Sequence, residues 1–150
     1  MGAPILLGGG SFTVDDCATI FVEPGSNLFR PRPDPAAFTI LSAVNSELRC
    51  AGYQMANVRR GKPGDVRCRC NLSDAGYVEV ILVAEKTSGP LRSFLLMAWD
   101  FSKLSSPANG SQVWEALCSV ADDVIQKRFH GSPLIRLNPS EIDFRAGAVM

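Results

Sequence analysis

The residues best suited to chemistry are five cysteines and a single histidine, His130. Cys68 and Cys70 are two residues apart, and in an extended chain this spacing places both thiols on one face. Zinc-binding pairs are usually spaced Cys-x-x-Cys or wider, because a turn then brings the two sulfurs together. With one histidine to complete a set of ligands, this spacing predicts two packed cysteines and no metal site.

A hydrolase would need His130 as a general base beside a nucleophile, and Cys17 and Cys118 are the nominal candidates. Neither cysteine lies in a recognisable nucleophile turn, and Cys118 falls on the apolar side of a helical pattern. The neighbouring acids Asp122 and Asp123 are predicted to face solvent on that same helix. The sequence therefore predicts a non-enzymatic protein, with no catalytic residues and no cofactor.

Basic residues gather between Arg49 and Arg69 and give the chain its one strong charge asymmetry. Arg67 and Arg69 share the strand face opposite to the two cysteines, an arrangement that suits an anion. The candidate anion-binding residues are Arg59, Arg60, Lys62, Arg67 and Arg69. The whole chain has no net charge, and no aromatic residues alternate with these arginines. We therefore expect a solvated or partner-facing edge in preference to a nucleic-acid site.

The elements that must position these residues centre on residues 65–101, which hold the one unbroken succession of strand patterns. Alternating or β-branched and aromatic runs are separated there by short turns, which indicates a three-stranded antiparallel meander. Its strands are predicted at 66–72, 77–86 and 91–101. Ala18–Val22 and Tyr53–Val58 are predicted as further short strands.

Two amphipathic helices accompany these strands. The first is predicted to follow an N-cap at Asp34 and a first-turn Pro35, and to stop at Gly52. The second is predicted to start at Ser111 and end at His130, whose ring would interact with the helix dipole. Both helices need a sheet face to pack on. The sequence therefore predicts the α+β class: a two-layer sandwich with both helices on one face of an antiparallel sheet of four or five strands.

One domain is predicted for residues 1–150, a length that buries a sizeable core. Residues 1–16, interrupted by Gly8-Gly9-Gly10, are expected to form a flexible arm, and residues 132–150 a C-terminal tail. No run approaches the ~20 apolar residues of a membrane span. No basic region precedes the short apolar run near the start, as it would in a signal peptide. We expect a cytoplasmic protein if Met1 is the native start, with the periplasm as the alternative.

The strand at 91–101 has two apolar faces, although an antiparallel sheet with one solvated face should be polar on that side. If Leu96 points to the helices, the face opposite to them carries an apolar set: Tyr77, Ile81, Leu95, Met97, Trp99 and Phe101. We expect the protein to bind a protein partner through these residues, most simply as a homodimer. In the alternative, Ile5–Leu7 or Leu134–Leu137 folds back over the same patch and completes a monomeric core.

One segment of the sequence matches a known layout. Thr19-Ile20-Phe21-Val22-Glu23-Pro24 leads through Asn27 and Arg30-Pro31 into a helix that ends at Gly52-Tyr53. This order resembles the opening of small Gram-negative envelope lipoproteins of the lipopolysaccharide-assembly type, and the likeness extends over residues 18–128. The resemblance implies a periplasmic assembly or ligand-binding module and assigns no site residues. Cys17 departs from a lipid-attachment site because acidic residues precede it.

Overall fold

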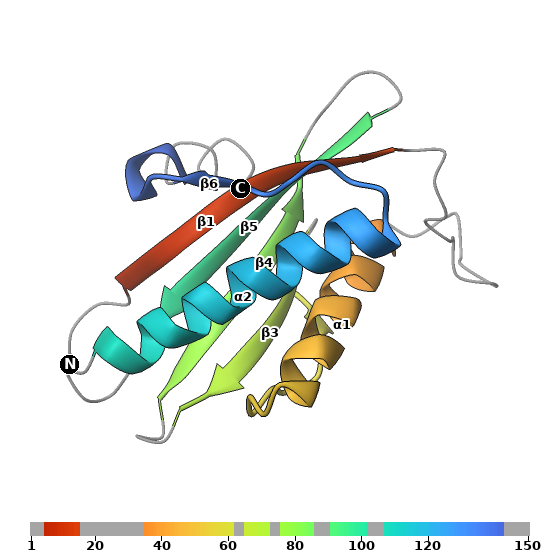
Figure 1. Ribbon diagram of the computed structural model, residues 1–150. Helices are drawn as coiled ribbons and strands as arrows, with labels where there is room; N and C mark the ends of the chain where they lie inside the picture. Colours follow the sequence, from red (N-terminus) through yellow and green to blue (C-terminus); the bar gives the residue numbers. More distant parts are fainter. Residues whose placement is uncertain are drawn as a thin grey trace.

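The computed structural model describes residues 5–15, 35–61, 65–72, 76–85, 91–101 and 107–142. These residues form an antiparallel sheet with two helices packed on one of its faces (Figure 1). The strand order is β2-β3-β4-β5-β1-β6. The predicted α+β class is confirmed, and the described part of the chain holds six strands instead of the expected four or five.

The elements follow the chain in an order that puts the first strand beside the fifth. Their bounds are β1 (Ile5–Asp15), α1 (Pro35–Cys50), β2 (Arg59–Arg60), β3 (Asp65–Asn71), β4 (Tyr77–Ala84), β5 (Leu91–Asp100), α2 (Pro107–Arg128) and β6 (Ile135–Leu137). The predicted meander corresponds to β3, β4 and β5. The strand expected at Ala18–Val22 lies outside the described residues. Residues 53–58 form no strand, and only Met55 makes an isolated bridge, to Cys70.

The C-terminal ends of α1 and α2 are each followed by a residue with left-handed backbone conformation. Gly52 has φ 98°, so the Gly52 N–H reaches the Arg49 carbonyl and the Tyr53 N–H reaches the Leu48 carbonyl, each at 3.0 Å. This is the backbone arrangement in which glycine closes a helix, as the sequence predicted. α2 begins at Pro107, four residues before the predicted start at Ser111. After α2 ends, His130 takes φ 51° and the chain reverses direction.

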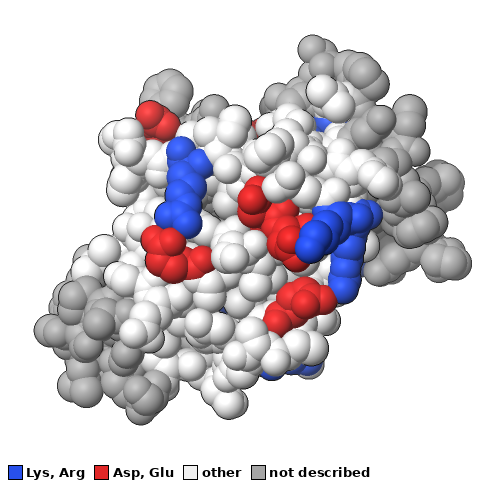
Figure 2. All heavy atoms as spheres, viewed as in Figure 1, with Lys and Arg blue, Asp and Glu red and all other residues white. Residues whose placement is uncertain are grey.

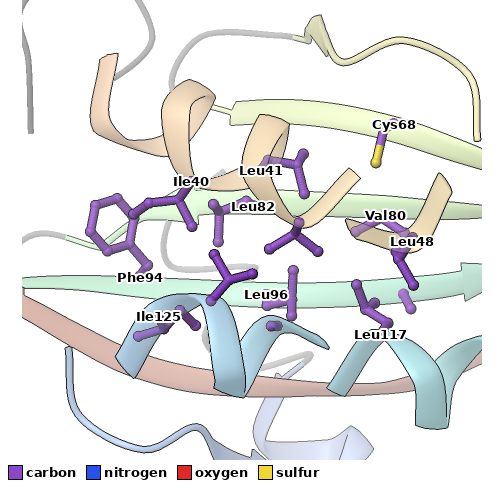
Figure 3. Close-up of a cluster of buried hydrophobic side chains, with 14 of the residues drawn as sticks. Ile40, Leu41, Leu48, Cys68, Val80, Leu82, Phe94, Leu96, Leu117 and Ile125 are labelled. Atoms are coloured by element: carbon purple, nitrogen blue, oxygen red, sulfur yellow. The ribbon is translucent and has the colours of Figure 1, made fainter. Parts of the chain in front are cut away.

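The core lies between the helices and the inner face of the sheet, the face turned toward α1 and α2 (Figure 3). Leu82 and Leu96 from neighbouring strands meet Ile40 and Leu41 from α1 and Leu117 from α2. Each of these side chains is almost fully buried, and burial of one such side chain stabilises a fold by about 1.5–3 kcal/mol. The apolar residues that recur every second position in the strands and every three or four positions in the helices therefore meet in one core.

Residues 5–15 do not form the expected flexible arm. They form β1, which pairs with β5 from Ile5 opposite Asp100 to Asp15 opposite Leu91, with an irregularity between Leu6 and Gly8. On its other side β1 pairs with β6 at the edge of the sheet. The N-terminal segment is therefore an interior strand of the sheet.

The three consecutive glycines of β1 are explained by close packing and not by a linker. A Cβ atom added to any of them would approach a neighbouring side chain to 2.6 Å: Trp114 at Gly8, Ile142 at Gly9 and Leu134 at Gly10. Real Cβ atoms do not approach so closely. Glycine in a strand often marks such an approach of another group to the backbone.

Candidate functional site

The face of the sheet that points away from the helices is the candidate site, and we call it the outer face. Leu96 belongs to the inner core, whereas Leu95 and Met97 belong to a second apolar cluster on the outer face. Ile81 lies opposite Met97, and Trp99 packs against the same cluster. The strand alternation in the sequence thus predicted correctly which residues share this face.

The centre of the outer face is covered by the chain itself. Ile142 is fully buried and lies in one cluster with four strand residues: Ile81, Val83, Leu95 and Met97. Leu6 and Leu137 pack against the cluster from β1 and β6. This is the intramolecular cover of the alternative interpretation, with Ile142 as a residue that the sequence did not indicate. Ile81, Leu95 and Met97 are therefore core residues of the folded chain.

A helical turn places Ile142 on this face. The carbonyl of Asn138 accepts hydrogen bonds from the N–H groups of Glu141 (3.0 Å) and Ile142 (3.2 Å). The Asn138 side chain also donates to the carboxylate of Glu141 at 3.5 Å. Pro139 occupies the first position of the turn, where its missing N–H costs nothing. The sequence Asn138-Pro139-Ser140-Glu141 therefore starts a helix, which extends over a single short turn.

Aromatic residues at one end of the outer face stay accessible, and we call Tyr77, Trp99 and Phe101 the aromatic patch. The rings of Tyr77 and Phe101 stack with centroids 4.9 Å apart and planes inclined by 12°. Phe101 is 36% exposed, and Tyr77 and Trp99 are partly exposed. Ile5, which is 64% exposed, begins the adjacent strand. Among the residues described, this patch is the aromatic part of the apolar surface left open on the outer face, and Leu91 at the other end of β5 is also exposed there.

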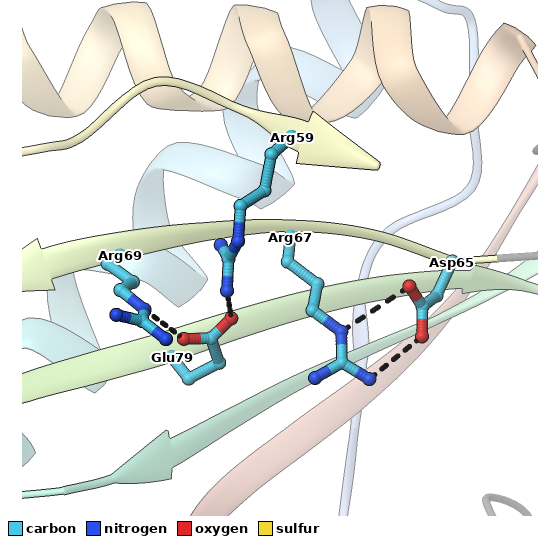
Figure 4. A network of polar contacts seen from close by, with 5 residues as sticks. All are labelled: Arg59, Asp65, Arg67, Arg69 and Glu79. Atoms are coloured by element: carbon cyan, nitrogen blue, oxygen red, sulfur yellow. Dashed lines mark hydrogen bonds and ion pairs between the residues drawn. The ribbon is translucent and has the colours of Figure 1, made fainter. Parts of the chain in front are cut away.

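A buried carboxylate stands beside the patch and holds two arginines (Figure 4). Glu79 Oε2 accepts from Arg69 Nε at 2.7 Å, and Glu79 Oε1 pairs with Arg59 Nη2. The Glu79 side chain is 5% exposed, whereas those of Arg59 and Arg69 are 42% and 44% exposed. Glu79 therefore fixes both guanidinium groups in place while each keeps a solvent-facing side.

A second ion pair lies beside the first on β3. Arg67 Nη2 donates to Asp65 Oδ2 at 2.9 Å and Arg67 Nε donates to Asp65 Oδ1 at 3.3 Å. The Asp65 carboxylate is buried, and its hydrogen bond raises the pKa of Arg67. The fork of a guanidinium matches a carboxylate in this way, which adds orientation as well as attraction.

The structure divides the five predicted anion-binding residues. Arg59, Arg67 and Arg69 have carboxylate partners on the outer face. Arg60 instead lies over the ring of Phe38 from α1, 5.6 Å from its centroid. Lys62 lies outside the described residues. The charge that the sequence shows as a cluster is thus largely compensated, and it is spread over two sides of the sheet.

The stacking geometry of Tyr77 bears on the nucleic-acid alternative. The Arg69 guanidinium carbon lies 4.2 Å from the Tyr77 ring centroid, and Phe101 stacks on Tyr77 as well. Because Arg69 is on β3 and Phe101 follows β5, the two groups flank β4 from opposite sides. Both ring faces of Tyr77 are therefore in use, and a nucleobase would need a free ring face to stack on.

The cysteines are packed where the spacing predicted. Cys68 and Cys70 both point into the inner core, each 1% exposed. Burial raises the pKa of Cys68 to about 12 and also raises the pKa of Cys70. Burial raises the pKa of Cys118 on α2 to about 11. Thiolate nucleophiles need the opposite shift, and no group of three metal-ligating side chains occurs in the part of the chain that the structure describes.

Asp122 is not the purely solvated acid that the sequence predicted. Its Oδ1 accepts the backbone N–H of Leu134 at 2.8 Å and ties the segment after α2 to the helix. The neighbouring Asp123 is exposed and pairs with Lys127 at 2.9 Å. A hollow of about 420 Å³ lies between the helix and this segment, lined by Cys118, Ser119, Val120, Asp122, Asp123, Gln126, Leu134 and Arg136. Which segment folds over a helix cannot be deduced from helical periodicity alone.

On the helix side of the molecule, the described residues carry interleaved charges and form no large patch of one sign (Figure 2). Exposed ion pairs join α2 to its neighbours, with Arg128 on Glu47 at 2.6 Å and Arg136 on Glu115 at 2.8 Å. Such pairs are typical of a solvated surface and contribute little stability. The outer face, with its aromatic patch and buried carboxylates, is the more distinctive surface.

Comparisons with models of protein families, with curated protein sequences and with solved structures gave no match to this chain. Of the residues that carry the resemblance to envelope lipoproteins, those from Thr19 to Pro31 lie outside the described residues, whereas the helix end at Gly52-Tyr53 is described. Within the described ranges, no helix is both long enough and apolar enough to cross a bilayer.

Proposed function

We propose that this chain is a non-enzymatic protein-binding module that acts through the aromatic patch on the outer face of its sheet. In the simplest case the partner is a second copy, which would give a homodimer. The observation that carries the proposal is the partial exposure of Tyr77, Trp99 and Phe101 side by side on the sheet. Aromatic residues are enriched at protein interfaces because they bury large areas at low entropic cost.

The charged border of the patch supports a specific contact. Glu79 lies directly opposite Trp99 and orients Arg59 and Arg69, and Arg69 lies over the Tyr77 ring. Charges fixed at the rim of an apolar patch guide the orientation of a partner and exclude partners of the wrong charge. Nucleic acid is less well served by this surface, because the arginines are paired with carboxylates and Tyr77 has no free ring face.

Molecular mass in solution tests the proposal, measured by sedimentation over a wide concentration range. We expect a concentration-dependent dimer that Trp99→Glu or Phe101→Glu abolishes without unfolding the chain. Leu91→Glu is the matched control, because Leu91 is 51% exposed at the opposite end of β5. A monomer at every concentration would contradict the homodimer. Equal effects of the Leu91 and Phe101 substitutions would contradict the assignment to the patch.

A further inference from the structure

Residues 132–142 form a strap that crosses the edge of the sheet from one face to the other. At its start Leu134 packs with the inner core and lies over Gly10. At its end Ile142 lies over Gly9 and fills the outer cluster. Between them β6 pairs with β1 (Figure 1). The two glycines thus provide one receiving site on each face of the same strand.

Apart from the turn that begins at Asn138, the polar contacts of the strap with the other described residues are made with β1 and α2. The Ser132 N–H donates to the Thr13 carbonyl at 2.9 Å, and the Thr13 N–H donates to Ser132 Oγ at 3.0 Å. Asp122 accepts the Leu134 N–H. Arg136 reaches Glu115 on α2 with two hydrogen bonds, of 2.8 and 3.1 Å. A second copy of the chain offers every one of these partners in the same geometry.

The connection between α2 and the strap is a tight reversal. His130 has φ 51°, and it is the one residue other than glycine with a positive φ among those the structure describes. A side chain in this region is disfavoured because its Cβ crowds the following carbonyl. The next residue is also confined, since a Cβ on Gly131 would lie 2.8 Å from the Thr13 carbonyl oxygen. The reversal is therefore the strained part of an otherwise well-packed segment.

We propose that two copies of this chain exchange their straps, so that residues 132–142 of each copy dock on β1 and α2 of the other. Exchange keeps all contacts of the strap and replaces only the reversal at His130 and Gly131 by an open connection. Swapping an identical element in this way is a low-energy route to a dimer, and strained hinges favour it. The inference goes beyond the proposed function, because the exchanged contacts do not involve the aromatic patch.

A disulfide that can form only between copies tests the exchange. Ser11 and Ile135 are direct partners in the pairing of β1 with β6. One chain carries Ser11→Cys and the other Ile135→Cys, both with Cys17→Ser and Cys50→Ser so that no other accessible thiol competes. The two chains are unfolded, mixed, refolded together and oxidised. We expect a covalent heterodimer on a non-reducing gel, and its fraction should rise with protein concentration.

Two controls make the result decisive. A chain with both Ser11→Cys and Ile135→Cys should form the disulfide in dilute solution within one copy, which confirms the geometry of the pair. Replacing Ser11→Cys by Leu91→Cys in the mixing experiment should abolish the heterodimer, because Leu91 pairs with Asp15 at the other end of β1. An internal disulfide in the double variant with no heterodimer in the mixture would overturn the exchange.

The hinge supplies a second and independent measurement. Glycine adopts positive φ without penalty, so His130→Gly should weaken the dimer roughly tenfold, whereas His130→Val should strengthen it. Dissociation constants from sedimentation would show both shifts. A dimer made through the aromatic patch would respond to Trp99→Glu and not to the hinge. A dimer whose dissociation constant is the same in both hinge variants would therefore contradict strap exchange, and it would not contradict the proposed role of the aromatic patch.

Discussion

Glu79 on β4 lies directly opposite Trp99 on β5, so the outer face changes from charged to apolar across one strand pair. On the β3 side of Glu79 stand Arg59 and Arg69, and on the β5 side begins the aromatic patch. The carboxylate is buried because these groups enclose it. The positions of Arg59 and Arg69 depend on the negative charge of Glu79, and Trp99 is its partner across the strand pair.

We expect Glu79→Gln to lower the free energy of unfolding by about 1–3 kcal/mol, the cost of leaving charged partners without their counter-charge. The exposure of both arginines to water limits the effect. Urea unfolding measures it. Glu115→Gln is the matched control, because it breaks an exposed pair with Arg136 and should have a much smaller effect. Equal losses in the two variants would contradict the structural role of Glu79.

Gly8→Ala should destabilise the fold by about 1–3 kcal/mol, because the new methyl group would press on the ring of Trp114. Thermal unfolding measures the loss, and near-ultraviolet circular dichroism should change as the ring moves. Gly52→Ala is the comparison: its φ is 98° but no atom lies within 4 Å of the added Cβ. That substitution should cost about 1 kcal/mol from the backbone alone and leave the aromatic spectrum unchanged.

Thiol labelling should separate Cys50 from the other described cysteines. Cys50 is exposed, whereas Cys68, Cys70 and Cys118 are buried with raised pKa values. In a Cys17→Ser background, one thiol should react with a disulfide reagent at once and three should react only as the fold opens. A buried thiol that reacts ahead of Cys50 would favour the rival interpretation, a cysteine hydrolase.

The same thiols predict a loss of stability at alkaline pH. The folded pKa values of Cys68 and Cys118 are raised to about 12 and about 11, above the ~8.5 of an unfolded thiol. The stabilisation of the fold by these two protonated thiols is complete below the unfolded pKa, and it is lost as the pH rises toward the folded pKa values. Each thiol should contribute a slope of about 1.4 kcal/mol per pH unit. Urea unfolding between these pH values should show a shallower decline for Cys68→Val, and an unchanged slope would refute the assignment.

Adjacent aspartates on α2 should differ sharply in their effects. Asp122→Ala removes the acceptor of the Leu134 N–H and should cost about 1 kcal/mol, whereas Asp123→Ala removes only an exposed ion pair. Asp122→Asn keeps an acceptor oxygen and should recover most of the loss. Hydrogen exchange at the Leu134 amide provides a local readout. The prediction fails if that amide exchanges equally fast in both alanine variants.

The alternation of residues within β4 and β5 was enough to predict which side chains share a face. A strand has a side-chain period of two, so once Leu96 points to the helices Leu95 and Met97 must point away. The helix-stop at Gly52 is equally local, since one residue determines it. These features could be predicted because they depend on neighbours in the sequence.

Features that depend on distant partners were missed. Gly8-Gly9-Gly10 has the composition of a linker, and only the positions of Trp114, Ile142 and Leu134 show why glycine is needed there. The pairing of Arg59 and Arg69 with Glu79 likewise follows from the register of three strands. A single sequence displays the cluster of positive charge but not the acids that compensate it.

The place of β1 in the sheet affects the order in which the molecule is assembled. β1 lies early in the chain, yet its main partner is β5, which lies far along the sequence. During synthesis the segment with its three glycines must wait until β5 has emerged, and the strap that closes over it comes later still. Contacts of such high sequence separation slow folding, because loop-closure entropy is lost before they form. We therefore expect the β3–β5 meander to form first and the addition of β1 to limit the folding rate.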